Sequence, residues 1–402
     1  IGGGIAGLSS AYMLSKHYHC TLFEESDRLG GVARTIDDVD TGVVYIKGVE
    51  MYPYLTRFFK EFNIETRVLP ITLAVTNVEG KKDWISSDIE NWTPEIKEEI
   101  MKFDKLMNSA ESDTTMSIKL FCLKYKFSNY FMDYIIPCIL GMILHRDTMT
   151  TFMFKTIYKS LPLLDVCDWR LPVNGTKEYV KKFSEPIQEI RLNCPVLSIE
   201  RNDKVKITTK HGEESFDYVV MATPMKINNI LLKDKTLEEL SLFNKYSYNI
   251  VNVILHNDIN FVNNIKTRSY INCNCKEAMN TIFPKYKKGE TKIPDPPYIL
   301  VTERNDVPID KSKIIDKRSY NHPDYNNIDS YGGYDYRNKL LKYIQGKNNT
   351  FYCGQDTVNE YWHELVLQSG LHVANLLGVP LPFKSEGYKL FLPFNNIIGF
   401  KY

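Results

Sequence analysis

The sequence of 402 residues has no apolar run long enough to cross a membrane. Its most apolar stretch runs from Tyr134 to Leu144, about half of the ~20 residues that a spanning helix needs. We therefore expect a buried helix there, with a membrane-touching face as the alternative. A secretory signal is lacking too, so a cytoplasmic location is the expectation.

An excess of charge of one sign is also missing. The chain has 50 Lys and Arg against 49 Asp and Glu, which gives a formal net charge of +1. Such a balance provides no electrostatic basis for binding nucleic acid or an anionic membrane. We expect no nucleic-acid partner.

Cysteines are few and dispersed. The eight of them form no disulfide framework, which favours reduced thiols in a cytosolic setting. Cys273-x-Cys275 has the wrong spacing for a zinc knuckle, and no other His/Cys group has metal-ligand spacing, so no metal site is expected. A P-loop and a G-x-S-x-G elbow are absent as well.

What the sequence does have is a nucleotide-binding pattern at its start. Gly2, Gly4 and Gly7 give the spacing G-x-G-x-x-G, and an apolar helical pattern follows them. Ile1 would then be the last residue of a strand. Such glycines let the backbone turn tightly and approach a pyrophosphate, which rests on the helix N-terminus. Glu24, at the end of the next short strand, is placed to accept hydrogen bonds from an adenosine ribose. The alternative is a glycine-rich turn without a ligand.

The residues after that strand narrow the choice of ligand. The segment Asp27-Arg-Leu-Gly-Gly31 resembles the D-R-x-G-G entry to the FAD-binding domain of the flavin amine oxidase superfamily. Many amine oxidases have an arginine after the glycine pair, where this chain has Val32. The pyrophosphate would therefore be bound by Arg28 and by backbone amides. In this segment the resemblance implies the cofactor-binding residues Glu24, Glu25, Arg28, Gly30 and Gly31.

A second match lies in the middle of the chain. Residues 216–224, FDYVVMATP, resemble the "fDxVVxAtP" strand and turn of the same superfamily, where the turn passes close to the cofactor. Thr223 takes the turn position. Val196, which precedes this segment in the sequence, takes the position of the family's valine that contacts the adenine. The alternative is an ordinary strand pair.

A third match comes near the end of the chain, in residues 351–356, 362–364 and 369–370. By the resemblance, Gly354 and Asp356 lie near the ribityl and pyrophosphate groups, and Glu364 and Leu365 begin a helix whose N-terminus meets the flavin. Such a helix start would stabilise negative charge on a reduced flavin.

Two residues of this third match are our catalytic candidates. His363 takes the position whose backbone amide meets the flavin, and Trp362 takes an aromatic position at its reactive face. Core packing is the alternative for Trp362. For His256 and His322, a structural role is favoured over catalysis.

One subgroup of the superfamily resembles the chain most. Asp40-Thr-Gly42 and Tyr52-Pro-Tyr-Leu55 resemble the "DTGF…YPNL" of predicted NAD/FAD-binding, amine-oxidase-like proteins associated with cyclopropane-fatty-acid synthase-type methyltransferases. The chain departs from that subgroup before and after His363, at Val358–Tyr361 and at Leu365-Val366. Side chains there would reshape a loop that glycines usually form.

The resemblance implies an α/β fold in which an FAD-binding, Rossmann-like domain is assembled from separated segments and interrupted by an α+β substrate domain. We assign residues 1–50, 172–235 and 340–380 to the FAD-binding domain and 51–171 and 236–339 to the substrate domain. Residues 381–402 would be a C-terminal extension. Two consecutive domains are the alternative.

The function implied is that of a flavin-dependent oxidoreductase that holds FAD non-covalently. A hydride would pass from a substrate C–H to flavin N5, the substrate being an amine or an acyl lipid. The alternatives are a catalytically inert flavin-fold interaction protein and a redox-neutral flavin mutase. The sequence leaves open a homo-oligomer and a peripheral membrane contact.

Overall fold

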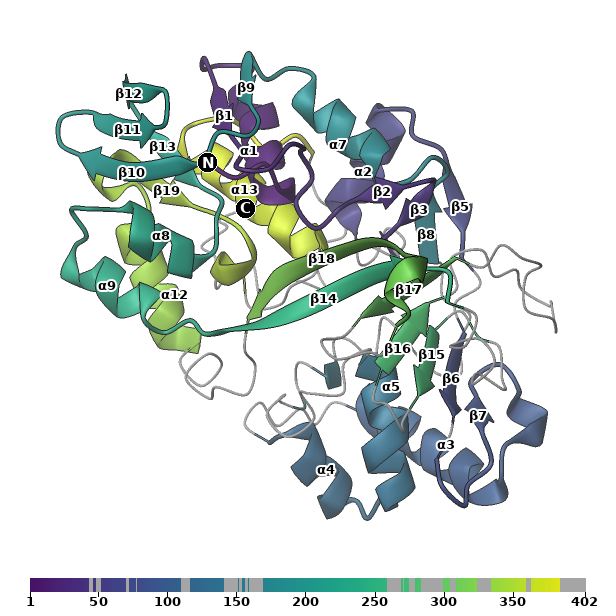
Figure 1. Cartoon of the computed structure of the whole chain (residues 1–402). Coiled ribbons are helices and arrows are strands. Elements are labelled where there is room, and N and C mark those ends of the chain that lie inside the picture. Colours follow the sequence, from purple (N-terminus) through teal and green to yellow (C-terminus); the bar gives the residue numbers. More distant parts are fainter. Residues whose placement is uncertain are drawn as a thin grey trace. The chain divides into compact units, whose positions relative to one another are not determined.

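In the computed structural model the chain forms two compact units (Figure 1). Unit 1 comprises Ile1–Arg67, Leu171–Tyr248 and Ile328–Tyr402, and unit 2 comprises Val68–Arg170 and Asn249–Asn327. The structure describes residues 1–42, 46–47, 52–69, 72–76, 78–109, 116–140, 151, 154–155, 158, 169–258, 269, 271–274, 279–282, 299–303, 309–323, 334–358 and 363–383.

Parallel strands form the centre of unit 1. Strand β1 (Thr21–Phe23) pairs with β9 (Glu189–Arg191), and β13 (Val219–Met221) pairs with β19 (Thr350–Tyr352). The first residues join the two pairs, because Gly2 N donates to Phe23 O at 2.9 Å and Ala222 N donates to Ile1 O at 2.9 Å. The carboxyl ends of these strands meet at one edge, which is where α/β sheets bind ligands.

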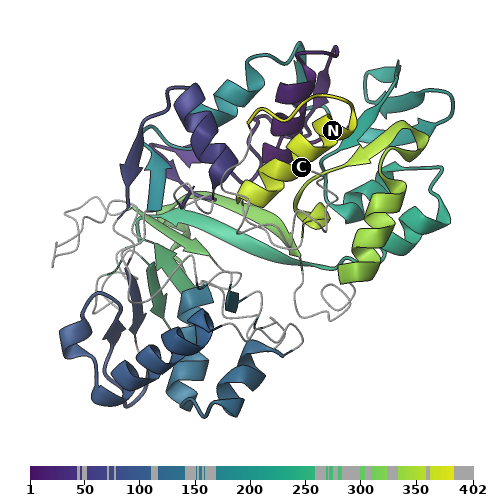
Figure 2. The same ribbon diagram turned by 180° about the vertical axis from the view of Figure 1, so that it is seen from behind.

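Two helices pack closely beside these strands (Figures 1 and 2). Nine of the ten residues of α1 (Ile5–Leu14) are buried, so this helix is covered all round. Helix α13 (His363–Leu376) approaches it through Gly370, whose added Cβ would lie 2.2 Å from Ala6 O. Ser9 Oγ also donates to Leu367 O at 2.9 Å. The helix expected to begin at Glu364 and Leu365 is confirmed, and it ends at Leu376.

An aromatic cluster binds α2 (Pro53–Glu61) to α1 and α7 (Lys177–Ser184). The Tyr12 ring meets the rings of Phe58 and Phe183 edge-on, at centroid distances of 5.7 and 5.4 Å. Residues 51–67 lie in unit 1, whereas the sequence placed them in the substrate domain.

Unit 1 also contains a three-stranded antiparallel sheet in the order β10 (Val196–Arg201), β11 (Val205–Thr209), β12 (Gly212–Phe216). Buried and half-buried residues alternate along β11, and Gly212 at the start of β12 has φ +122°. Helices α8 (Met225–Leu231), α9 (Leu237–Phe243) and α12 (Tyr334–Ile344) pack around it. Their core includes Phe23, Ile199, Ile207, Met221, Leu242, Phe243, Ile344 and Tyr352.

Unit 2 contains a mainly antiparallel sheet of seven strands. Its order is β18 (Ile314–Pro323), β14 (Tyr248–His256), β17 (Leu300–Glu303), β16 (Met279–Ile282), β15 (Ile271–Asn274), β6 (Leu73–Thr76) and β7 (Trp84–Ile85). Its helices are α3 (Pro94–Asn108), α4 (Ile118–Lys124), the π-helical turn η2 (Phe131–Ile135) and α5 (Ile136–Leu140). Of the run 134–144, the structure describes residues 134–140, which are helical; residues 135–139 are buried, as expected, and Tyr134 is half-buried.

The remaining described elements are short. They are β2 (Thr35–Ile36), β3 (Val39–Asp40), β4 (Ile46–Lys47), β5 (Thr66–Val68), β8 (Trp169–Pro172) and the 3₁₀ turns η1 (Ile89–Asn91), η3 (Lys311–Lys313), η4 (Lys347–Asn349) and η5 (Gln355–Thr357). Over the described ranges, none of the helices combines the length and apolarity that spanning a membrane requires.

Candidate functional site

The three glycines of the first motif are needed for three different reasons. Gly2 has φ +98°, and an added Cβ would lie 2.8 Å from Ala222 O. Gly7 packs inside the turn, where a Cβ would lie 1.9 Å from Gly2 O. A Cβ on Gly4 would meet nothing within 4 Å. Gly2 and Gly7 thus build the turn, and Gly4 borders open space that a ligand can enter.

The start of α1 faces that space without a side-chain cap. Its N-cap is Gly4, no side chain accepts from the first turn, and the first turn contains no acidic residue. Leu8 N, which donates to Gly4 O at 2.9 Å, makes the first bond of the helix. The amides before it are the orphan donors of a helix N-terminus, which attract anions such as phosphate.

Glu24 is fixed at the end of β1, directly beside this turn. Its Oε2 accepts from Gly3 N at 2.6 Å, and its Oε1 accepts from Ser26 N and Ser26 Oγ at 2.9 and 2.6 Å. A carboxylate offers about four acceptor sites, so three are used. The remaining capacity fits one more donor, as a ribose hydroxyl would supply.

The loop after Glu24 packs its glycine pair on the first motif. Gly30 N donates to Gly3 O at 2.8 Å, and a Cβ on Gly31 would lie 3.1 Å from Gly4 Cα. Arg28 braces this loop, since its guanidinium donates to the carbonyls of Leu29, Ala33 and Gly31 at 3.1, 3.1 and 2.6 Å. Glu25 is exposed. That Arg28 and Glu25 bind a cofactor stays a prediction.

Val196 and Thr223 both lie close to the residues of the first motif. Val196 begins β10, and Cys194 N just before it donates to Glu24 O at 2.9 Å. Thr223 follows β13, and a Cβ on Gly2 would lie 3.2 Å from its Cγ2. The Thr223 hydroxyl itself donates to Asn228 Oδ1. The turn after β13 therefore borders the glycine turn.

The third motif supplies two acidic side chains that serve as helix caps. Gly354 follows β19 with φ +115°, and the Asp356 carboxylate just after it accepts from Met225 N at 2.7 Å. This bond caps the start of α8. Tyr248 also donates its hydroxyl to the Asp356 carboxylate, and Tyr246 donates to the Asp356 backbone carbonyl.

Glu364 caps helix α2 in the same way. Its Oε1 accepts from Tyr54 N at 2.9 Å and its Oε2 accepts from Leu55 N at 3.0 Å, while Gln368 Nε2 donates to Oε1 at 2.8 Å. The side chain is fully buried. Burial raises the pKa of this carboxyl to about 7, although the hydrogen bonds from Gln368, Tyr54 and Leu55 act in the opposite direction.

His363 lies beside Glu364 at the start of α13. Its Nε2 is 2.9 Å from the hydroxyl of Tyr179, a fully buried residue of α7. Burial lowers the pKa of His363 to about 4, so the ring is neutral at pH 7. Leu365 is fully buried. Trp362, our other catalytic candidate, lies outside the described residues.

A buried hydrogen-bond network around Asp40 supports helix α7, which carries Tyr179. No role in the site was assigned to this network from the sequence. Asp40 Oδ1 accepts from Thr35 Oγ1, Thr176 N and Thr176 Oγ1 at 2.7, 2.8 and 2.9 Å. Burial raises the pKa of Asp40, against these bonds. Asp40 therefore fixes the start of α7, which carries Tyr179. The one sequence signal for this network is that Asp40 and the distant pair Gly175-Thr176 both belong to segments that resemble the family.

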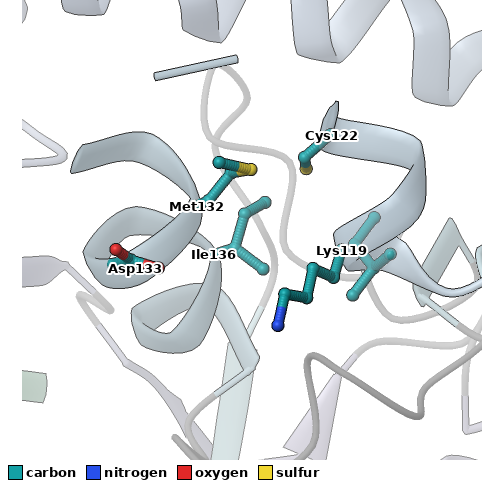
Figure 3. Close-up of a pocket in the computed structure, with 6 residues that line it drawn as sticks. Lys119, Cys122, Met132, Asp133 and Ile136 are labelled. Carbon is teal, nitrogen blue, oxygen red and sulfur yellow. The ribbon is translucent and has the colours of Figure 1, made fainter. Parts of the chain in front are cut away.

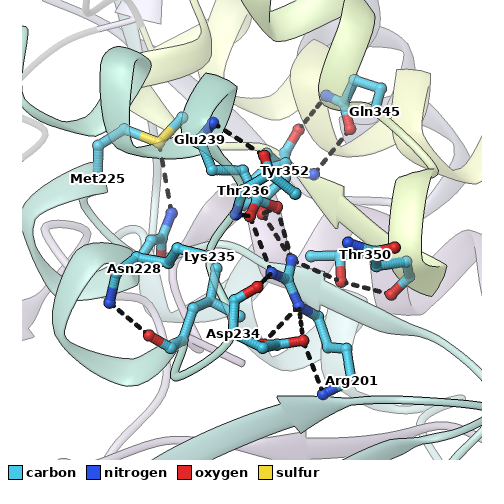
Figure 4. Close-up of polar contacts among 12 residues, drawn as sticks. Arg201, Met225, Asn228, Asp234, Lys235, Thr236, Glu239, Gln345, Thr350 and Tyr352 are labelled. Atoms are coloured by element: carbon cyan, nitrogen blue, oxygen red, sulfur yellow. Dashed lines mark hydrogen bonds and ion pairs between the residues drawn. The ribbon is translucent and has the colours of Figure 1, made fainter.

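A buried ion pair between Arg201 and Glu239 in unit 1 has a structural role (Figure 4). Arg201 is fully buried and donates to both carboxylate oxygens of Glu239 at 2.6 and 2.8 Å. Burial opposes ionisation of Glu239, but the bonds from Arg201 keep its pKa below the ordinary value. Tyr352 donates to Glu239 Oε1 at 2.7 Å. This network ties β10, α9 and β19 together.

A small apolar pocket lies in unit 2, apart from these residues (Figure 3). It has a volume of about 30 Å³, enough for a water molecule but not for a cofactor. It is lined by Ile118, Lys119, Cys122, Met132, Asp133 and Ile136.

His256 of unit 2 is held on both sides of its ring. Its Nε2 is 2.8 Å from Thr302 Oγ1, and Asp258 N donates to its Nδ1 at 3.3 Å. Burial lowers its pKa to about 4. These contacts favour the structural role expected for His256. The side chain of His322 lies outside the described residues.

Comparison with known proteins agrees with this geometry. The family of flavin containing amine oxidoreductases matches residues 5–267. No curated protein sequence matches the chain.

Solved structures share the fold over nearly the whole chain. One is the CLA-producing fatty acid isomerase from P. acnes, which is 15% identical, with a TM-score of 0.67 over 94% of this chain and 96% of that one. Putrescine oxidase bound to putrescine is 12% identical, with a TM-score of 0.67 over 94% and 98%. Cyclohexylamine oxidase from Brevibacterium oxydans is 12% identical, with a TM-score of 0.64 over 94% and 98%.

These likenesses show the fold, and the family match covers more than half of the sequence. The chain therefore belongs to the flavin containing amine oxidoreductase family and is a flavin-dependent oxidoreductase with an amine-oxidase-like fold.

Proposed function

We propose that the chain binds FAD non-covalently in unit 1. The observation that carries this proposal is the open space at Gly4, next to a helix start that no side chain caps. The Gly4 turn and the amides of α1 would hold the pyrophosphate, and Glu24 would hold the ribose. Val196 would lie against the adenine.

The thiols near this site support non-covalent binding. Cys353 directly precedes Gly354, is almost fully buried, and has a pKa that burial raises to about 12. Such a thiol stays protonated at pH 7 and is a poor nucleophile. Cys194, near Glu24, is also buried.

When bound, FAD would supply a hydride acceptor at flavin N5 for a substrate C–H. The chain's own part is to position the reactants and to stabilise charge. The start of α13, at His363 and Glu364, would place amide donors at the pyrimidine edge of the flavin. His363 stays neutral, and the Tyr179 hydroxyl fixes its ring. Trp362 would pack at the reactive face.

We propose an amine or an acyl lipid as the substrate. Putrescine oxidase and cyclohexylamine oxidase share the fold and are named for amines, and a fatty acid isomerase shares it and is named for an acyl chain. The resemblance to proteins associated with cyclopropane-fatty-acid synthase-type methyltransferases gives the acyl lipid equal weight with the amine. A cytoplasmic location, a homo-oligomer and a peripheral membrane contact belong to this proposal.

A redox-neutral use of the flavin is the second candidate. Its support is that an isomerase shares the fold. Such an enzyme would convert its substrate without lasting reduction of the flavin, so the two candidates differ in what anaerobic substrate does to the flavin.

The test begins with the visible absorption spectrum of the purified protein before and after denaturation. We expect flavin bands that leave the protein with the supernatant once it is denatured. Anaerobic addition of amines and acyl lipids should then bleach the bound flavin. Product formed without bleaching would favour the redox-neutral candidate. A colourless protein that FAD cannot reconstitute would contradict the proposal and favour an inert interaction protein.

A further inference from the structure

Two buried cysteines of unit 2 lie in direct contact, although 135 residues separate them in the sequence. Cys138 is on helix α5 and Cys273 is on strand β15, and their Sγ atoms are 2.8 Å apart. Cys138 Sγ also lies 3.6 Å from the carbonyl oxygen of Ala74 in β6. The two side chains are 1% and 2% exposed.

The contact is closer than ordinary packing allows. Carbon atoms reach their best separation at about 3.5–4.0 Å, and sulfur is the larger atom. The two elements also have fixed positions. Strand β15 pairs with β6 on one side and with β16 on the other, and α5 packs on β6. The sulfurs are thus held together by the packing of a helix on a sheet.

We propose that Cys138 and Cys273 form a redox-sensitive pair, which a peroxide oxidises to a disulfide. Local opening at helix α5 admits the peroxide, and one cysteine loses its proton to become the nucleophilic thiolate. The thiolate attacks a peroxide oxygen, and the O–O bond breaks to give a sulfenic acid, while the hydroxide that leaves takes up the released proton as one water. The second thiol then displaces the hydroxyl group from the sulfenic sulfur as a second water. Two thiols and one hydrogen peroxide thus give one disulfide and two waters. The pair loses the two electrons that the peroxide gains.

The bond would join helix α5 to an inner strand of the seven-stranded sheet. Helix α5 follows the π-helical turn η2, and Ile136 at its start lines the small pocket of Figure 3. A crosslink across 135 residues restricts the unfolded chain strongly. Oxidation should therefore raise the temperature at which unit 2 unfolds.

Peptide mapping of the full chain after hydrogen peroxide tests this proposal. Remaining thiols are blocked with N-ethylmaleimide before digestion with trypsin. Cys138 is the one cysteine of peptide 127–146, while peptide 269–276 contains both Cys273 and Cys275. We expect the two peptides to be joined, and two fewer thiols than in the reduced protein. Cys275→Ser should keep the link and Cys273→Ser should abolish it.

Thermal unfolding supplies a second readout. The oxidised wild type should unfold at a higher temperature than the reduced protein, and dithiothreitol should remove the difference. Cys275→Ser and Cys122→Ser should retain the difference. The proposal is overturned if Cys138 and Cys273 are both recovered as alkylated thiols or as sulfinic acids, or if the link persists in Cys273→Ser. Should that variant fail to fold, mapping of Cys275→Ser alone decides between the two outcomes.

Discussion

Helices α1 and α13 lie side by side in unit 1, and both begin where the family motifs predict flavin contacts, yet their first turns are built differently. The first turn of α1 carries no polar side chain, has no side-chain cap and borders open space at Gly4. The start of α13 carries two polar side chains that are already bound, His363 to Tyr179 and Glu364 to the start of α2.

The comparison shows two ways in which a motif residue can contribute to a binding site: it can leave backbone donors free for the ligand, or it can hold neighbouring helices in place. At α1 the absence of a capping side chain leaves backbone donors available to an outside anion. At α13 the side chains hold neighbouring helices, so that what the helix start can offer a ligand is its backbone amides and its dipole. A motif acid can thus be needed for the shape of the site without touching the ligand.

The largest effect is expected from Gly7→Ala. The new Cβ would lie 1.9 Å from Gly2 O, a backbone atom that cannot move without opening the turn. Overpacking of this kind costs about 3 kcal/mol or more, which exceeds the ~1 kcal/mol that alanine gains in a helix. Urea unfolding of the apoprotein measures the loss. Gly4→Ala makes the same chemical change in open space and is the control. Equal stability of the two variants would contradict the packing argument.

Glu364→Gln should cost less and should depend on pH. One amide oxygen cannot accept from Tyr54, Leu55 and Gln368 together, and the new NH₂ group would face a backbone donor, at a cost of about 1–3 kcal/mol. The carboxyl pKa is about 7 in the folded chain, against 4.5 as its ordinary value. Between these pH values the folded chain keeps a proton that the unfolded chain has lost, so this residue's contribution to stability falls as pH rises.

Urea unfolding at pH 5 and pH 8 measures the pH dependence. The stability difference between wild type and Glu364→Gln should be larger at pH 5. Burial also raises the pKa of Glu303, to about 7, but that effect is present in both proteins and cancels. A difference that grows toward pH 8 would mean that the carboxylate form is the one that stabilises α2.

Glu24→Gln should have the smallest effect. The glutamine can still accept from Gly3 N, so the turn should keep its shape. It would lose the charge that strengthens a hydrogen bond from a ribose hydroxyl, which we expect to weaken FAD binding about fivefold, or about 1 kcal/mol. Fluorescence titration of the apoprotein with FAD measures this change. Asp27→Asn, at an exposed position of the same loop, should bind FAD like the wild type.

The sequence predicted those parts of the fold that depend on neighbouring residues. The turn at Gly2, the strand after Asp217 and the helix ended by Gly378 each follow from local glycine and apolar patterns, and each is confirmed.

The partners of buried polar side chains could not be predicted in the same way. The Glu364 carboxylate accepts from Tyr54 and Leu55, which are 310 and 309 residues away in the sequence. The Asp40 carboxylate accepts from Thr176, which is 136 residues away. Such contacts depend on how the elements pack, and no local pattern contains them. The motif resemblance suggested that Glu364 and Asp356 contribute to cofactor binding, which stays a prediction. The structure adds what the motifs do not contain, namely that the Glu364 carboxylate caps α2 and the Asp356 carboxylate caps α8.

The central claim is that the turn at Gly4 receives the cofactor, and Gly4→Ala tests it most directly. Gly4 has φ −73° and ψ 178°, which alanine adopts without strain. FAD titration of the apoproteins should show affinity reduced at least about tenfold, a loss of about 1.4 kcal/mol, while the apoprotein unfolds at the wild-type temperature. Unchanged FAD affinity in a folded Gly4→Ala protein would contradict the claim.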